Sequence, residues 1–121
     1  MKPNFVSIGA GCAAAGVVLG AFGAHALRGS VGEAGLALWE TATRYWFVGA
    51  LGTLGFGLFQ RQRESSAVPG VLLLLGSTLF SLSLYGLALG APRILGAVTP
   101  FGGLGLIAGF CGFAWVARGS R

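Results

Sequence analysis

The chain is 121 residues long, 55% hydrophobic and 9% charged, and its mean hydropathy is +0.81. This composition leaves too few polar residues to cover a soluble domain of that size, so it excludes a soluble globular protein and indicates a membrane protein. The net charge of +5 does not indicate a nucleic-acid partner, because the basic residues are scattered and form no basic run.

Four apolar segments follow one another along the chain, and each is close to the roughly 20 residues that a membrane-spanning helix needs. We expect helices at about 4–27, 36–60, 68–91 and 95–117. The second has an uncharged core of only 45–60 and reaches spanning length by including residues from Leu36 on, where Glu40 and Arg44 have the spacing of an i,i+4 ion pair. The gaps are short, so consecutive helices should be antiparallel neighbours. The predicted fold class is therefore all-α: a four-transmembrane-helix antiparallel bundle forming one domain, residues 1–121.

The first apolar segment also has features of a secretory signal, because Lys2 precedes it and the small-residue sequence 24–26 ends it. It is longer than the apolar core of a usual signal. We therefore expect it to be retained as a membrane helix.

Basic residues predict the orientation, since cytoplasmic loops carry an excess of Lys and Arg. Five lie on the side of the two termini and three on the other side: Lys2, Arg61, Arg63, Arg118 and Arg121 against Arg28, Arg44 and Arg93. We expect both termini in the cytoplasm and a multi-pass protein of the cell (inner) membrane. Trp39, Tyr45 and Trp46 would then form an aromatic belt at the outer interface, and Trp115 would lie at the inner one.

Small residues recur every fourth position on three of the expected helices, a spacing that lets helix backbones approach closely. These are Gly16, Gly20 and Ala24 on the first, Gly86 and Gly90 on the third, and Gly105 and Gly109 on the fourth. They predict contacts within the bundle or, alternatively, between subunits. Ser77, Ser81 and Ser83 should donate either to the preceding turn or to a neighbouring helix.

Polar residues gather at the predicted outer end, and they are the candidate polar cap or ligand site: His25, Arg28, Glu40, Arg44, Tyr85 and Thr99. Ionisable groups at membrane depth usually find partners, so we expect His25 to bond to Tyr85, Glu40 or a backbone carbonyl. The cluster would cap and orient the helices, bind a ligand, or handle protons or ions.

Metal, cofactor and enzyme chemistry are not expected. The single histidine lies at the outer end, whereas Cys12 and Cys111 lie toward the inner leaflet, so they cannot converge on zinc. We expect the cysteines to be small buried hydrophobes. With three acidic residues and no serine in an elbow motif, no hydrolytic triad can be assembled.

Four sequence motifs resemble the YgdD/YwdK family of small four-helix membrane proteins, a domain of unknown function numbered 423. They are GAFGAHAL (20–27), TATRY (41–45), LFSLSLYGLAL (79–89) and GAVTPFGGLGLIAGF (96–110), which together cover essentially the whole chain. The resemblance implies a multi-pass inner-membrane location and no established activity. Members of the family commonly carry a second histidine four residues after the tyrosine of the second motif, and here that position is Gly49. A mechanism that requires two histidines is therefore in doubt for this chain.

Two classes of function remain. The first is a structural or accessory membrane protein that packs against itself, as a homo-oligomer, or against a larger membrane complex, with the lipid bilayer as its surroundings. The second is an oligomeric transporter or channel for small solutes or ions, gated by the outer polar cluster. No predicted span has a charged residue near its midpoint, where coupling sites usually occur, and this favours the first class.

Overall fold

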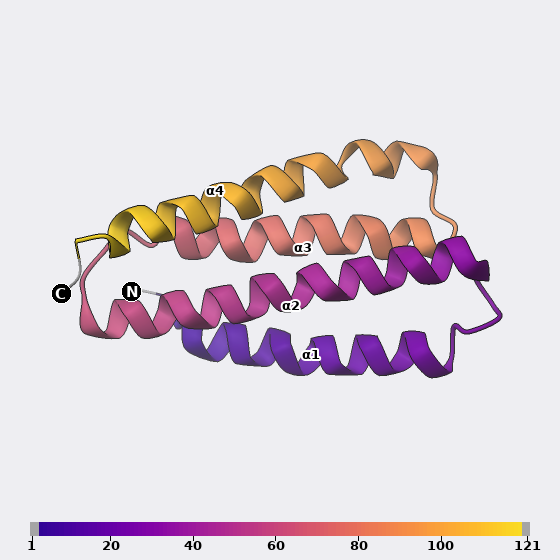
Figure 1. Cartoon of the computed structure of the whole chain (residues 1–121), viewed down its shortest axis with the longest axis horizontal. Helices are drawn as coiled ribbons and strands as arrows, with labels where there is room; N and C mark the ends of the chain where they lie inside the picture. The colour runs from indigo at the N-terminus through magenta and orange to yellow at the C-terminus, as the bar shows by residue number, and fades with distance from the viewer. Residues whose placement is uncertain (1–2, 120–121) are drawn as a thin grey trace.

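The computed structural model describes residues 3–119, which form four long α-helices and one short 3-10 helix (Figure 1). The elements are α1 (Phe5–His25), α2 (Gly32–Gln62), α3 (Val68–Ala88), η1 (Arg93–Ala97) and α4 (Thr99–Ala117). Successive α-helices run antiparallel, so α1 begins and α4 ends at the same end of the molecule (Figure 1). We call this the proximal end, and the end that holds His25 and η1 the distal end. The predicted all-α, antiparallel arrangement is confirmed.

Three segments are long and apolar enough to cross a membrane: α1, α3 and the stretch 93–117 that contains η1 and α4. The remaining helix, α2, is 31 residues long, ~46 Å, against a hydrocarbon core of ~30 Å. Because α1 and α3 both run from the proximal to the distal end, the chain between them must return across the bilayer, and α2 is that return (Figure 1). Its lower apolarity comes from Glu33, Glu40 and Arg44 in its distal half.

The helices of the predicted antiparallel bundle lie side by side in chain order (Figure 1). Within the described residues α1 packs mainly on α2, α2 on α3, and α3 on α4, while α1 and α4 share no substantial contact. As a result 44% of the membrane-spanning window of α3 is buried, compared with 17% for α1 and for the segment that contains α4. Both outer helices present a broad apolar face to the lipid.

Contacts between neighbouring helices recur at every seventh residue, the period of left-handed, nearly parallel helix packing. On α1 the buried positions after Phe5 are Gly9, Gly16 and Gly23, all facing α2. A Cβ atom on Gly16 would lie 2.9 Å from the rings of Trp46 and Phe47, so only glycine lets the two helices come this close. On α2 the positions that face α3 and its neighbours repeat in the same way at Gly35, Ala42, Gly49 and Phe56.

The small residues singled out in the sequence lie in several settings. Gly16 faces α2, Gly86 faces Leu95 of η1, and Gly105 and Gly109 face α3. Gly20 also faces α2, because a Cβ atom placed on it would lie 3.6 Å from the methyl group of Thr43. Two expectations need correction. Ala24 is exposed, because the contact face of α1 follows a seven-residue rather than a four-residue repeat. Gly90 does not pack a helix but adopts φ +96° in the turn that ends α3, a conformation that favours glycine.

Helix ends differ from the predicted ones where turn residues intervene. α3 ends at Ala88 rather than at residue 91, because the turn at Gly90 lets the Ala91 N–H donate to the carbonyl of Gly86 (2.9 Å). The last helix is expected from residue 95, but residues 93–97 form η1, and α4 starts with Pro100 in its first turn, where a missing N–H costs nothing. α2 begins at Gly32, earlier than the expected residue 36.

Candidate functional site at the distal end

The six residues of the predicted polar cap all lie in the distal part of the molecule, but they do not form one cluster. His25, Arg28, Glu40 and Arg44 are exposed, whereas Tyr85 is buried and Thr99 is half-buried. Tyr85 and Thr99 each bond to a different partner, on different faces of α3. The four charged or ionisable residues therefore form a scattered rim, and only the two hydroxyl groups belong to the packed interior.

His25 makes no hydrogen bond or ion pair with any of residues 3–119, so the predicted bond to Tyr85, Glu40 or a carbonyl is not formed. The reason is geometric. The buried positions around the end of α1 are Gly23 and Leu27, which face the interior, whereas the intervening His25 is exposed. Glu40 and Arg44 likewise form no ion pair with each other or with another residue of the described part of the chain, and both side chains are exposed on α2.

Buried Trp39 and Tyr85 and half-buried Thr43, here called the Trp39 cluster, join three helices near the distal end. Trp39 is 5% exposed, and its indole N–H donates to the backbone carbonyl of Leu19 on α1 (2.8 Å). Its ring lies 4.2 Å, centroid to centroid, from that of Tyr85 on α3. The hydroxyl groups of Tyr85 and Thr43 are 2.6 Å apart. This cluster therefore connects α1, α2 and α3 by one indole and two hydroxyl groups.

The direction of the hydrogen bonds in the Trp39 cluster follows from counting protons. Thr43 donates its hydroxyl hydrogen to the carbonyl of Trp39, one turn earlier (3.0 Å). A hydroxyl group has one hydrogen to give, so Tyr85 must be the donor in its bond with Thr43. Every polar atom of the cluster is thereby used within the protein, and the phenol has no hydrogen left for a ligand.

The serines of α3 also have their hydroxyl hydrogens engaged. Each donates either to a carbonyl in the preceding turn of α3 or to a carbonyl of a neighbouring helix. Ser81 donates to the carbonyl of Ala42 on α2 (2.8 Å), and Ser77 to that of Leu73 (2.7 Å). Ser83 donates to its own helix, so Thr99 of α4 donates to Ser83 across a 2.6 Å contact. Among the described residues no buried side-chain nitrogen or oxygen lacks a partner. The predicted two uses of these serines are both present.

The aromatic residues expected in an outer belt have two different roles. Trp39 and Trp46 are not belt residues: they lie between α1 and α2, and the Trp46 indole N–H donates to the carbonyl of Cys12 (2.7 Å). Trp115 is 66% exposed and stacks under the Arg118 guanidinium, as an interfacial residue does. The sequence does contain a sign of this packing. Trp39 and Trp46 are seven residues apart, and so are Gly23 and Gly16, the glycines that they contact on α1.

The two cysteines and Gly49, the position of the family's second histidine, lie in different surroundings. Cys12 is half-buried on α1, and Cys111, expected to be buried, is exposed on α4, because α4 lies at the edge of the row. Within residues 3–119 no three His, Cys, Asp or Glu side chains come together as metal ligands do. Gly49 is buried against Ser77 at the contact of α2 with α3, so helix packing fills the space beside it.

Replacing His25 by alanine should leave the fold intact. Because its side chain is exposed and has no partner among the described residues, we expect the free energy of unfolding to change by less than about 0.5 kcal/mol. Unfolding in a titration with sodium dodecyl sulfate would measure the change. Tyr85→Phe is the comparison, because it removes the buried donor to Thr43 and should cost about 0.6 kcal/mol or more. A larger loss for His25→Ala than for Tyr85→Phe would contradict this assignment.

These features define a small, multi-pass helical membrane protein whose interior polar side chains mainly form hydrogen bonds between its helices. Residues 19–103 match the family described as a protein of unknown function (DUF423), and the chain belongs to this family. It is similar to UPF0382 membrane proteins of Staphylococcus haemolyticus (43% identical over 107 residues, 88% of each chain) and of Bacillus subtilis, YwdK (39% over 106 residues, 85% of this chain and 86% of the relative). It is also similar to the UPF0382 inner membrane protein YgdD of Escherichia coli strain K12 (40% over 96 residues, 78% of this chain and 73% of the relative). No solved structure matches the chain.

Membership in this family confirms the resemblance that the four motifs indicated. The matched region, 19–103, contains the Trp39 cluster together with η1 and the start of α4. The protein is a multi-pass protein of the cell (inner) membrane, embedded in the lipid bilayer, and its relatives are named as membrane proteins without an activity.

Proposed function

We propose that the protein is a structural or accessory component of the membrane, which packs laterally against copies of itself or against a larger membrane protein. One observation carries the proposal. The buried hydroxyl groups of the described residues belong to Thr53, Ser77, Ser81, Ser83 and Tyr85, and each bonds to the backbone or to a neighbouring helix. No charged side chain in this described part of the chain is buried, and the one buried phenol, that of Tyr85, is already engaged with Thr43.

Transport is a weaker candidate on the same grounds. Coupling ions and protons usually pass charged or carboxyl-bearing residues near the middle of the bilayer. In this chain Glu40 and Arg44 are exposed on the distal half of α2, and the hydroxyl groups deeper in the membrane are already bonded. An accessory role needs none of these groups. It needs lateral surface, which the open faces of α1 and α4 provide.

Purification from the native membrane in a mild detergent tests the proposal. We expect the tagged protein to elute in a stoichiometric assembly, either of its own copies or with one larger membrane protein, identified by mass spectrometry and by the mass of the particle. A monomer with no stoichiometric partner would contradict the proposal. So would a homo-oligomer that conducts ions or carries solutes when it is reconstituted in liposomes.

We also propose that the proximal end faces the cytoplasm. Arg61 and Arg63 lie at the end of α2 and Arg118 at the end of α4, all at the proximal end, and the terminal Lys2 and Arg121 add to them in the sequence. In contrast, Arg28, Arg44 and Arg93 belong to the distal half. A green fluorescent protein fused after residue 121 should fluoresce, and alkaline phosphatase fused there should be inactive. Insertion of the two reporters after Ser30 is the matched control and should give the opposite pair of results. Active phosphatase at the C-terminus would reverse the assignment.

A further inference from the structure

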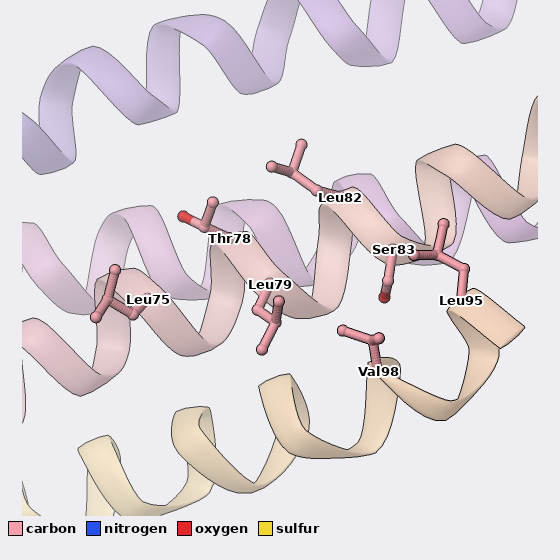
Figure 2. Close-up of a pocket in the computed structure, with 7 residues that line it drawn as sticks. All are labelled: Leu75, Thr78, Leu79, Leu82, Ser83, Leu95 and Val98. Carbon is pink, nitrogen blue, oxygen red and sulfur yellow. The ribbon is translucent and has the colours of Figure 1, made fainter. Parts of the chain in front are cut away.

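An apolar groove of about 470 Å³ lies between α3 and the segment that leads from η1 into α4 (Figure 2). Its walls are Leu75, Thr78, Leu79, Leu82, Ser83, Leu95 and Val98. Figure 2 shows Leu79 on α3 and Val98 before α4 pointing into the space between the two elements. Leu75, Leu79 and Leu82 are 61%, 43% and 53% exposed, so the groove opens sideways into the bilayer.

The wall chemistry requires an apolar occupant. Two hydroxyl-bearing residues, Thr78 and Ser83, line the groove, and the Ser83 hydroxyl is already bonded to the carbonyl of Phe80 and to Thr99. No charged residue lines the groove. A polar solute would therefore lose its bonds to water on entering and find at most the Thr78 hydroxyl in return.

The shape of the wall favours a flexible chain over a helix. Close packing of membrane helices depends on small residues that let the backbones meet. The groove walls carry no glycine or alanine, and branched side chains stand on both sides of the opening. A partner helix would be held away by these side chains, whereas a hydrocarbon chain can lie between them.

The length and the position of the groove match one leaflet. From Leu75 to Ser83 the helix rises ~12 Å, close to the ~15 Å that is half of the hydrocarbon core. The groove begins at Leu75, close to the midpoint of α3, and continues to Leu95 and Val98 toward the distal end, which is the course of an acyl chain in the distal leaflet.

A single positive charge stands where the headgroup of such a lipid would lie. Arg93 is the only charged residue from 68 to 117, and it is exposed at the start of η1, the element that also contributes Leu95 to the groove. The neighbouring Ile94 is 79% exposed, as expected for a segment that lies in the membrane interface. An arginine at this level attracts anionic headgroups and can bond to their phosphate.

We propose that this groove binds one acyl chain of an anionic phospholipid from the distal leaflet, with the lipid phosphate at Arg93. The site would exist whether or not the protein has an accessory role, because it uses only α3, η1 and the start of α4. A single basic residue near the membrane surface contributes enough for about a fivefold preference for an anionic over a zwitterionic lipid.

Native mass spectrometry of the delipidated protein in detergent tests this site, with phosphatidylglycerol and phosphatidylcholine of identical chains as probes. We expect one bound phosphatidylglycerol, held about fivefold more tightly than phosphatidylcholine. Leu79→Trp fills the groove and should weaken both lipids about tenfold. Leu104→Trp, a lipid-facing substitution on α4 away from the groove, is its control and should leave both unchanged.

Arg93→Gln distinguishes the contribution of the lipid headgroup to binding from that of the acyl chain. It should remove the preference for phosphatidylglycerol and leave the affinity for phosphatidylcholine unchanged, whereas Arg28→Gln, an exposed arginine on the α1 side of the same end, should alter neither. If Leu79→Trp fails to fold, Leu82→Trp fills the same groove from its exposed edge. Equal binding by the wild type and the groove-filling variant would overturn the proposal, as would a dimer that the groove-filling variant breaks apart, because a second copy would then be the occupant.

Discussion

Replacing Trp39 by alanine should destabilise the protein more than any other single truncation of a side chain. Trp39 contributes to the distal core with 5% of its surface exposed, packs on the ring of Tyr85, and donates to the carbonyl of Leu19. Truncating a buried tryptophan to alanine typically costs 3–5 kcal/mol. We expect a loss of about that size in the free energy of unfolding, measured by titration with sodium dodecyl sulfate in mixed micelles.

The expected loss of stability is large because Trp39 of α2 contacts both α1 and α3. Gly23 of α1 lies so close to the Trp39 indole that a Cβ atom there would overlap it, so the ring is the surface on which the end of α1 rests. Without the ring, α1 loses its distal support and the Leu19 carbonyl loses its indole donor. Tyr85 loses the neighbour against which its ring packs, although its bond to Thr43 can persist.

Two further variants separate these contributions. Trp39→Phe keeps a smaller aromatic ring and removes the N–H, so it should cost less than Trp39→Ala, with about 0.6 kcal/mol for the lost hydrogen bond plus the packing lost with the second ring. Trp115→Ala is the matched control, because Trp115 is 66% exposed on α4 and contacts Arg118, and it should change the stability by less than about 0.5 kcal/mol. If the two alanine variants had equal effects, the Trp39 cluster would not be the distal core.

The sequence was sufficient to predict the helices and their order, because the apolar segments are long and the gaps between them are short. It was not sufficient to predict which face of each helix is buried. The segments that form α1, α3 and α4 are apolar on every side, so the hydrophobic pattern that locates the core of a soluble helix has little contrast there. Packing is decided instead by where small residues allow close approach, and both four-residue and seven-residue series of glycines are present on α1.

The candidate site shows the same limit. His25 attracted attention as the only histidine, yet the buried residues of its motif are Gly23 and Leu27. The partner of Tyr85 is Thr43, 42 positions away in the sequence. Such a contact depends on the rotation of two helices about their axes, which the positions of ionisable residues along the chain do not determine.

Replacing Gly102 by leucine should prevent α4 from docking on α3. Gly102 is buried, and a Cβ atom on it would overlap the backbone nitrogen of Phe80 and come within 2.7 Å of its Cα and 2.9 Å of the carbonyl oxygen of Gly76. Each of these atoms belongs to a helix backbone, which cannot turn aside as a flexible side chain does. Overpacking a site whose surroundings can adjust costs about 1–3 kcal/mol, so we expect at least ~3 kcal/mol here.

Separation at this point would extend along the whole contact of α3 with α4. Gly76, the residue opposite, has the same close approach to the backbone of α4 at Gly105 and Leu106, so the two helices cross at a point where neither carries a side chain. Moving α4 outward by the width of a leucine would also pull Thr99 away from Ser83, which are held 2.6 Å apart. Ser83 would then retain only its bond to Phe80, and Thr99 would lose its acceptor.

Size-exclusion chromatography and unfolding in sodium dodecyl sulfate would measure this effect, with Gly11→Leu as the control. Gly11 lies on the exposed face of α1, and a Cβ atom there has nothing within 4 Å. Both variants put the same side chain in place of a helical glycine, so any general gain in helix propensity is common to them. The difference between them therefore reports the close approach alone. Equal stability of the two variants would mean that α4 is not held against α3 at Gly102.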